Sequence, residues 1–240
     1  MKAERYRNEW KYLIDMAQKE LICQRLFPYL QLDKHAKNGG YMIRSLYFDD
    51  YLQSAYEEKD AGILKRKKYR IRIYNCSDSS IKLERKKKYG SHIFKEAAKL
   101  TCEEVYKILD GDYGFLLKSD NNLLREFYYE CVSNVMRPRT IVDYDREPWI
   151  SDEGTVRITF DMDVRAAVGS YDIFDDTLPT LPVLEPGKCV MEVKFTEFLP
   201  QGLRSLLPDR ASEFTAVSKY VLCYEKTEYM NSFNKYWYHN

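Results

Sequence analysis

Basic side chains recur at every second position along several segments of the chain. The densest segment is 65–74 (KRKKYRIRIY), where alternate positions hold Arg66, Lys68, Arg70 and Arg72. Alternate side chains of a β-strand lie on the same face, so this segment would present a row of cations. Arginine and lysine are common partners of phosphoryl oxygens, and arginine can bind two of them at once. The spacing therefore predicts a phosphate-binding surface built from strands.

Carboxylates share these charged faces with the cations. The clearest pairs are Glu9 with Lys11, Glu84 with Lys86, and Glu192 with Lys194. Carboxylate oxygens are ligands that Mg²⁺ and Mn²⁺ prefer, and these ions also bridge phosphates. One charged strand would be an ordinary solvated face, but the pattern recurs on at least five predicted strands. The repetition favours a site for a metal-bound polyanion.

The elements that must position these residues are mainly strands. Period-two alternation predicts strands at 5–14, 41–49, 65–74, 81–89, 139–146, 156–163 and 188–195. Helical spacing, with a capping box at Thr101 and Glu104, predicts helices at 16–30, 101–110, 119–135, 202–207 and 210–224. Segments 75–80 and 175–187 are predicted loops because they are rich in turn residues.

Each predicted strand has an apolar or aromatic face opposite its charged one. The helices can bury the apolar faces, and closure of the sheet would give a barrel with the charged residues inside. A channel of this kind focuses the electric field and binds anions strongly. No repeat or low-complexity linker divides the sequence. We therefore predict a single α+β domain over residues 1–240, with an antiparallel barrel and surrounding helices.

Composition limits the alternatives. The formal net charge is +1, so anion binding requires local clustering of charge. The six cysteines include no Cys-x-x-Cys pair, which argues against a zinc site or a small disulfide framework and favours reduced thiols in a cytoplasmic protein. The sequence shows neither a signal-peptide core nor an apolar run long enough to cross a membrane. We expect membrane association only through a partner protein.

A series of short motifs in sequence order resembles the VTC domain, the polyphosphate polymerase domain of the vacuolar transporter chaperone complex. The motifs are Arg7-x-Glu9-x-Lys11-Tyr12, SLYFDD (45–50), RKKYRIRIY (66–74), LERKKK (83–88), Tyr144-x-Arg146, RITFD (157–161), MEVKF (191–195) and SKY (218–220). The resemblance spans residues 5–224. It places the chain among the triphosphate tunnel metalloenzymes and implies an eight-stranded antiparallel β-barrel.

The resemblance also implies synthesis of polyphosphate from ATP with Mn²⁺ or Mg²⁺. It assigns catalytic phosphate contacts to Arg70, Arg72, Lys86, Arg146, Arg157 and Lys194. It assigns further phosphate binding to Lys11 and Lys219, with Tyr144 and Ser218 as supporting hydrogen-bond donors. Lys68 is a further predicted phosphate-binding residue because it lies on the basic face of segment 65–74. Glu192 resembles the metal ligand, with Glu84 and Glu9 as additional carboxylates that orient groups or bind the metal. Arg7 stands where the cyclase and thiamine-triphosphatase branch has glutamate, which favours the polymerase branch.

Two other functions are compatible with the sequence. The first is hydrolysis of tripolyphosphate or a nucleoside triphosphate on the same fold. The second is non-catalytic binding of polyphosphate or RNA, with tyrosines beside the basic strands as stacking platforms. Alternation places Tyr69 and Tyr89 opposite the cations, which predicts core positions. We expect ATP and polyphosphate as partners, no nucleic acid and no membrane insertion, with any membrane association made through a membrane-protein partner.

Overall fold

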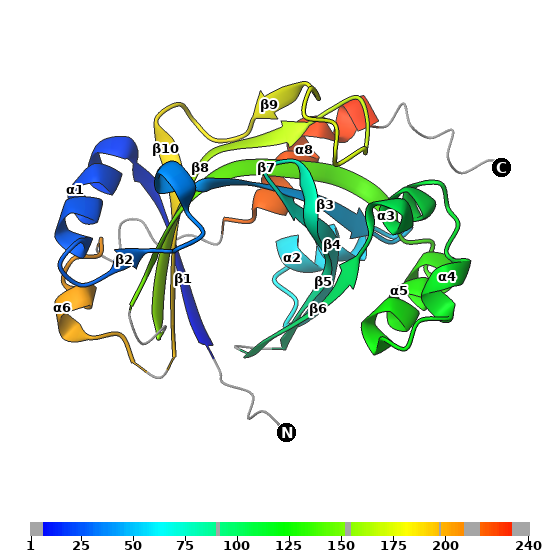
Figure 1. Cartoon of the computed structure of the whole chain (residues 1–240), viewed down its shortest axis with the longest axis horizontal. Coiled ribbons are helices and arrows are strands. Elements are labelled where there is room, and N and C mark those ends of the chain that lie inside the picture. The colour runs from blue at the N-terminus through cyan, green and yellow to red at the C-terminus, as the bar shows by residue number, and fades with distance from the viewer. Residues whose placement is uncertain (1–6, 90–91, 152–154, 197, 209–216, 232–240) are drawn as a thin grey trace. The chain divides into compact units, whose positions relative to one another are not determined.

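The computed structural model describes residues 7–89, 92–151, 155–196, 198–208 and 217–231. The strands are β1 (Arg7–Asp15), β2 (Gln31–Leu32), β3 (Tyr41–Asp49), β4 (Lys65–Tyr74), β5 (Ser77–Tyr89), β6 (His92–Leu100), β7 (Arg137–Ile150), β8 (Val156–Ala167), β9 (Thr180–Pro182) and β10 (Lys188–Thr196). The helices are α1 (Met16–Leu26), α2 (Ser54–Asp60), α3 (Cys102–Leu109), α4 (Gly114–Leu117), α5 (Asn122–Ser133), α6 (Gln201–Arg204) and α8 (Lys219–Asn231), with a 3-10 turn η1 (Lys37–Gly39). Figure 1 shows this α+β arrangement.

Hydrogen bonds join eight strands in the order β1-β10-β8-β7-β3-β4-β5-β6, while β2 pairs with β7 and β9 with β8. The eight-stranded antiparallel path agrees with the predicted fold. The predicted closure does not appear, because β1 and β6 end the order and the described residues show no pairing between them. The sheet is therefore open.

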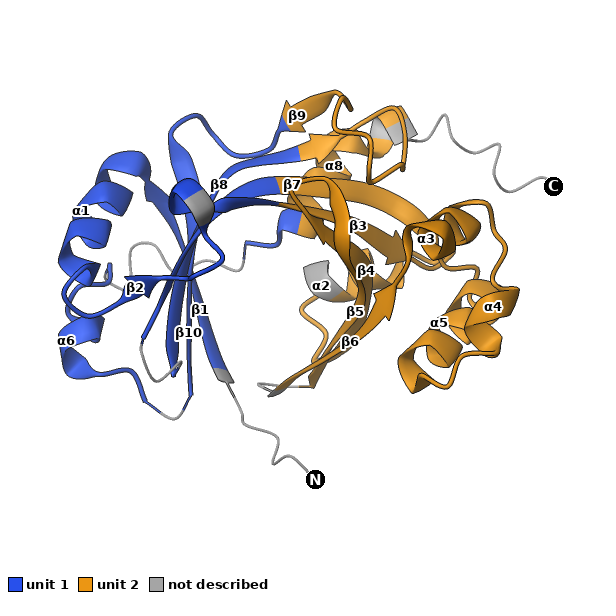
Figure 2. Cartoon of the chain, viewed as in Figure 1, with its two compact units in different colours: residues 1–42, 144–165, 182–219 blue, residues 43–143, 166–181, 220–240 orange. Residues whose placement is uncertain are grey.

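The chain divides into two compact units (Figure 2). Unit 1 comprises residues 1–42, 144–165 and 182–219, and unit 2 comprises 43–143, 166–181 and 220–240. Strands β3, β7 and β8 each contribute residues to both units. The prediction of a single domain stays a prediction.

Unit 1 packs α1 on the apolar face of β1, β10 and β8. Asp15 ends β1 and caps α1: its carboxylate accepts from the Gln18 amide, and the Gln18 side chain accepts from the Asp15 amide, both at 2.8 Å. Ile22 and Leu26 of α1 are buried with Phe160 and other apolar strand residues in one core. This packing leaves the charged side of the three strands uncovered by α1.

Unit 2 has its own core between β4, β5 and β6 and helices α3, α4 and α5 (Figure 1). The Phe127 ring of α5 lies 5.1 Å from Phe48 and 5.4 Å from Tyr69. Tyr69 is fully buried, as predicted. The same prediction is wrong for Tyr89, which is 63% exposed, because it is the last residue of β5 and the core does not extend to it.

Several boundaries differ from the predictions. Strand β6 falls in a segment for which no strand was predicted, and β9 lies inside the predicted 175–187 loop. The predicted 75–80 loop is only a two-residue turn, because Asn75 and Cys76 both adopt φ of 51° and join strands that pair through Tyr74 and Ser77. The last helix begins at residue 219, and residues 210–216 of its predicted span lie outside the described residues.

Candidate functional site

Three neighbouring strands of unit 1 carry their charged residues in register. Lys11 of β1 is paired with Glu192 of β10, and Glu192 is paired with Thr159 of β8. The next row holds Glu9, Lys194 and Arg157. Residues paired directly across antiparallel strands share a face, with Cβ atoms about 5 Å apart. The register therefore gathers side chains from three distant parts of the sequence on one face.

Glu192 is contacted by cations on both carboxylate oxygens. Its Oε2 accepts a hydrogen bond from Lys194 Nζ at 2.8 Å and lies 3.7 Å from Arg146 Nη2. Its Oε1 lies 3.9 Å from Lys11 Nζ. Burial opposes ionisation of Glu192, but Lys194, Lys11 and Arg146 together lower its pKa well below the usual range. The side chain is therefore a buried anion held among cations.

Asp161 organises a second group of charges in unit 1. Arg146 donates to both of its oxygens, at 2.6 and 2.8 Å, and Lys219 Nζ lies 2.6 Å from Oδ2. The Tyr144 ring lies against both cations, with its centroid 5.2 Å from the Arg146 guanidinium and 5.0 Å from Lys219 Nζ. Although burial opposes it, Arg146 and Lys219 lower the pKa of Asp161 to about 2.

Other predicted residues of unit 1 are placed less centrally. Glu9 lies 3.5 Å from Lys11. Arg157 contacts Asp33 at 3.3 Å and the Tyr41 hydroxyl at 3.0 Å, although it faces Lys194 in the register. Ser218 is half-buried immediately before α8. The structure thus brings Lys11, Arg146, Lys194 and Lys219 to Glu192 and Asp161, while Arg157 turns to Asp33.

Unit 2 contains a separate cluster around Glu84. Arg70 donates to Glu84 Oε2 through Nε and Nη2, at 2.8 and 2.7 Å, and Lys95 Nζ lies 2.5 Å from Oε1. Arg72 Nε lies 4.0 Å from Oε2. Burial opposes ionisation, but these three cations lower the pKa of Glu84 to about 2. Three cations therefore share one buried carboxylate.

Strand β3 positions the two arginines, a role that sequence reasoning missed. Ser45 is paired with Arg72 and accepts from its Nε at 3.1 Å. Tyr47 is paired with Arg70, and its hydroxyl accepts from Nη1 at 2.7 Å. Both residues belong to the SLYFDD motif. Their alternation on one face of β3 could have indicated this role.

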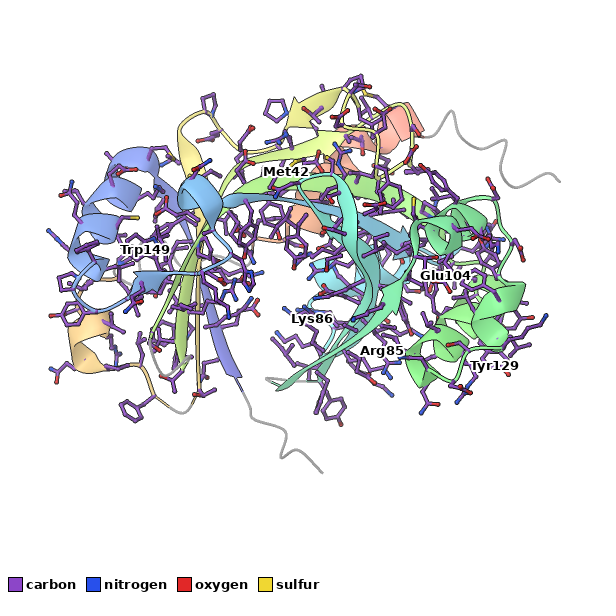
Figure 3. The ribbon with its side chains drawn as sticks, viewed as in Figure 1. Met42, Arg85, Lys86, Glu104, Tyr129 and Trp149 are labelled. Atoms are coloured by element: carbon purple, nitrogen blue, oxygen red, sulfur yellow. The ribbon has the colours of Figure 1, made fainter. Side chains whose placement is uncertain are left out.

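Strand β6 extends the basic face of unit 2. The register places Lys68, Lys86 and Lys95 in one row across β4, β5 and β6. Lys68 Nζ also lies 4.5 Å from the centre of the Tyr220 ring. Figure 3 labels Lys86 and Arg85, which leave β5 on opposite sides of the strand. Lys95 was missed because two alanines interrupt the alternation of β6.

The two clusters differ as candidate metal sites. The described residues contain no group of three or more histidine, cysteine or acidic side chains placed to hold a metal. Both oxygens of Glu84 contact cations at 2.8 Å or less, an arrangement typical of a counter-ion, whereas the cation beside Glu192 Oε1, Lys11 Nζ, lies 3.9 Å away. Glu192 lies beside Thr159, whose buried hydroxyl has no hydrogen-bond partner among the described residues. Because Mg²⁺ commonly uses one or two carboxylates together with substrate phosphates, the single carboxylate of Glu192 fits a metal that arrives bound to phosphate.

The balance of charges in each cluster is suited to binding phosphate. In unit 2 three cations face one carboxylate, so phosphate oxygens would find excess positive charge. In unit 1, Lys11, Arg146, Lys194 and Lys219 face Glu9, Asp161 and Glu192, four cations against three carboxylates. That near balance suits a phosphate whose charge is partly neutralised by a divalent ion.

Comparisons with known proteins bear on the family and the fold of the chain. The family model described as VTC domain matches residues 6–228. A putative adenylyl cyclase from Hippeastrum, described as having a dominant triphosphatase activity, aligns with a TM-score of 0.54 and 12% identity over 93% of this chain and 96% of its own. A putative adenylate cyclase from Vibrio parahaemolyticus aligns with a TM-score of 0.50 and 10% identity over 91% and 98%. At these identities the likeness establishes the fold alone.

No curated protein matches the sequence of the chain. Within the part of the chain that the structure describes, we find no helix with the length and apolar character needed to span a membrane.

Proposed function

Because the chain belongs to the VTC domain family, within the triphosphate tunnel superfamily, we propose that it is a metal-dependent polyphosphate polymerase. Its substrates would be ATP and a growing polyphosphate chain. The observation that carries this proposal is the excess of cations around a single buried carboxylate, Glu84, on a basic face that crosses three strands. Such a face suits a substrate with several consecutive phosphates.

In the proposed reaction, an oxygen of the terminal phosphate of the acceptor attacks the γ-phosphorus of ATP in line. A new P–O bond forms, the bond from the γ-phosphorus to the β–γ bridging oxygen breaks, and ADP leaves with that electron pair. The ionised phosphate is itself the nucleophile, so the protein needs no serine or cysteine nucleophile. Catalysis then depends on positioning and charge neutralisation.

The residues of the chain would supply both effects. Arg70 and Arg72 would bind equatorial phosphate oxygens, held in place by Glu84 and by the β3 side chains Ser45 and Tyr47. Fixed donors of this kind stabilise developing charge without reorganising during the reaction. Lys86 and Lys68 would extend the contact along the row that they share.

In unit 1, Arg146 and Lys194 would bind phosphate oxygens, and Glu192 would hold Mn²⁺ or Mg²⁺ with Thr159 close by. When bound, a divalent ion would neutralise part of the phosphoryl charge. Lys11, Tyr144, Ser218 and Lys219 would complete the unit 1 contacts. Arg157 would have to leave Asp33 to reach phosphate.

The decisive experiment is incubation of the purified protein with ATP and Mn²⁺, followed by gel detection of polymer and measurement of ADP. A polymerase produces long polymer and ADP. Arg72→Ala and Glu192→Ala should each reduce turnover by about a hundredfold or more, the scale of losing one transition-state donor. Near-normal turnover in both variants would remove these residues from the site.

The second candidate is a triphosphate hydrolase. It is favoured by the shared fold with the Hippeastrum protein, which is described as a triphosphatase. Arg7, in place of the glutamate of the hydrolytic branch, favours the polymerase. The same assay separates the two, because a hydrolase releases free phosphate without polymer. A cytoplasmic location and a membrane-protein partner for the product remain part of the proposal.

A further inference from the structure

Thr159 combines burial with an unsatisfied hydroxyl. It lies on β8 within unit 1 and is 1% exposed, and its Oγ1 has no hydrogen-bond partner among the described residues. A buried polar group without a partner is costly, and most such groups in native proteins are hydrogen-bonded. The hydroxyl is therefore placed to meet a group that is not part of the chain's own packing.

The register places this hydroxyl inside the unit 1 cluster. Thr159 is paired directly with Glu192, which is paired in turn with Lys11. Paired residues share a face, so the Thr159 side chain lies on the same face as the Glu192 carboxylate. On its own strand it stands between Arg157 and Asp161, both of which share that face.

The nearby charged side chains already contact one another. Glu192 accepts from Lys194, and Asp161 accepts from Arg146 and is contacted by Lys219. A ligand that belongs among these cations is an anion with several oxygens. A threonine hydroxyl can donate one hydrogen bond to such an oxygen.

On this geometry, and resting on the function proposed above, we propose that Thr159 is a substrate-binding residue whose hydroxyl donates a hydrogen bond to a phosphate oxygen of a bound tri- or polyphosphate. The residue would act beside Glu192, on the phosphate and not on the metal. Threonine at this position therefore contributes to ligand affinity but not to the stability of the free protein.

The experiment compares the full chain with Thr159→Val, which replaces the hydroxyl by a methyl group of similar size, and with Thr159→Ser, which keeps it. Binding of tripolyphosphate is measured by calorimetry without metal and with Mn²⁺, and binding of Mn²⁺ alone is measured by electron paramagnetic resonance. Urea unfolding is followed without ligand. Neither binding readout depends on turnover.

We expect Thr159→Val to weaken tripolyphosphate binding about tenfold, the scale of a lost hydrogen bond to a charged group. Thr159→Ser should bind within about twofold of the parent, as expected when the hydroxyl is retained. Without ligand, Thr159→Val should be as stable as the parent or more stable, because no hydrogen bond within the described protein is lost. Binding of Mn²⁺ alone should not change.

Three results would overturn the assignment: unchanged tripolyphosphate affinity in Thr159→Val, loss of Mn²⁺ binding with unchanged metal-free tripolyphosphate binding, or equal weakening in both variants with lower stability. The second result would make the hydroxyl a metal ligand, and the third would make it a packing group. If the parent protein itself binds no tripolyphosphate, the proposed function fails as well. That outcome is distinct, because it appears before any substitution is made.

Discussion

Arg146 and Asp161 form a two-pronged ion pair in unit 1, with Nε–Oδ1 and Nη2–Oδ2 distances of 2.6 and 2.8 Å. Asp161 is fully buried and Arg146 nearly so. The same carboxylate also contacts Lys219, the first residue of α8. One aspartate thus compensates two cations that were assigned to phosphate binding, and it sets their geometry in the absence of substrate.

Asp161→Asn should lower the free energy of unfolding by about 3 kcal/mol, because it leaves Arg146 and Lys219 buried without their main counter-charge. Urea unfolding followed by tryptophan fluorescence measures this, since Trp10 and Trp149 both lie in unit 1. Asp163→Asn is the matched control on the same strand. Its partner is Arg165 and its side chain is 60% exposed, so the change should stay below about 1 kcal/mol. Equal losses in both variants would contradict the prediction.

Acid should destabilise the protein through the buried carboxylates of Asp161 and Glu84. Asp161 and Glu84 have pKa values of about 2 in the folded state, below their unfolded values of about 4. Groups with lowered pKa stabilise the fold above the unfolded value, and that stabilisation is lost as pH falls toward the folded value. Urea midpoints should therefore fall steeply between about pH 4 and pH 2. The urea midpoint of Asp161→Asn should fall less steeply over the same pH range. A pH dependence parallel to that of the parent protein would contradict the role given to Asp161.

Truncation of two adjacent lysines of β5 should have unequal effects on kcat/KM. Lys86 lies in the basic row with Lys68 and Lys95, whereas Lys87 faces the helices and lies 3.5 Å from Glu126 of α5. Lys86→Ala should reduce kcat/KM for ATP about tenfold or more, on the scale of a lost charged contact to phosphate. Lys87→Ala should leave kcat/KM within about twofold, since exposed ion pairs contribute little. A larger loss of kcat/KM in Lys87→Ala than in Lys86→Ala would show that the substrate-binding face of β5 was assigned to the wrong side.

The Tyr47 hydroxyl should affect kcat/KM because it positions the Arg70 guanidinium. Tyr47→Phe removes the hydroxyl that accepts from Arg70 Nη1, so one side of the guanidinium loses its constraint while Glu84 still holds the other. We expect kcat/KM to fall about fivefold to tenfold, the scale of the roughly 1 kcal/mol that a typical hydrogen bond contributes.

Tyr224→Phe is the control for this change. It also removes a tyrosine hydrogen bond in unit 2, from α8 to Gln53 at 2.6 Å. Tyr224→Phe should change the free energy of unfolding without changing kcat/KM. If Tyr47→Phe lowers stability and leaves kinetics unchanged, the hydroxyl does not position the arginine.

Local sequence was sufficient to predict much of the secondary structure. Strands β3 and β4 have the predicted limits, and the capping box of Thr101 and Glu104 opens α3 as expected. These features depend on residues close in sequence: alternation assigns each strand its faces, and a cap needs only the next turn. Strand β6 was missed because Ala97 and Ala98 weaken its alternation.

Sequence by itself also determined which residues face the charged side, because side-chain direction in a strand follows from position alone. Which cation meets which carboxylate was decided only by the tertiary structure. Arg70 meets Lys95 at Glu84 because β5 pairs with both β4 and β6, and Arg157 turns to Asp33 although it faces Lys194 in the register. Ion pairs between remote segments depend on strand order and register, which the periodicity of a single strand does not contain.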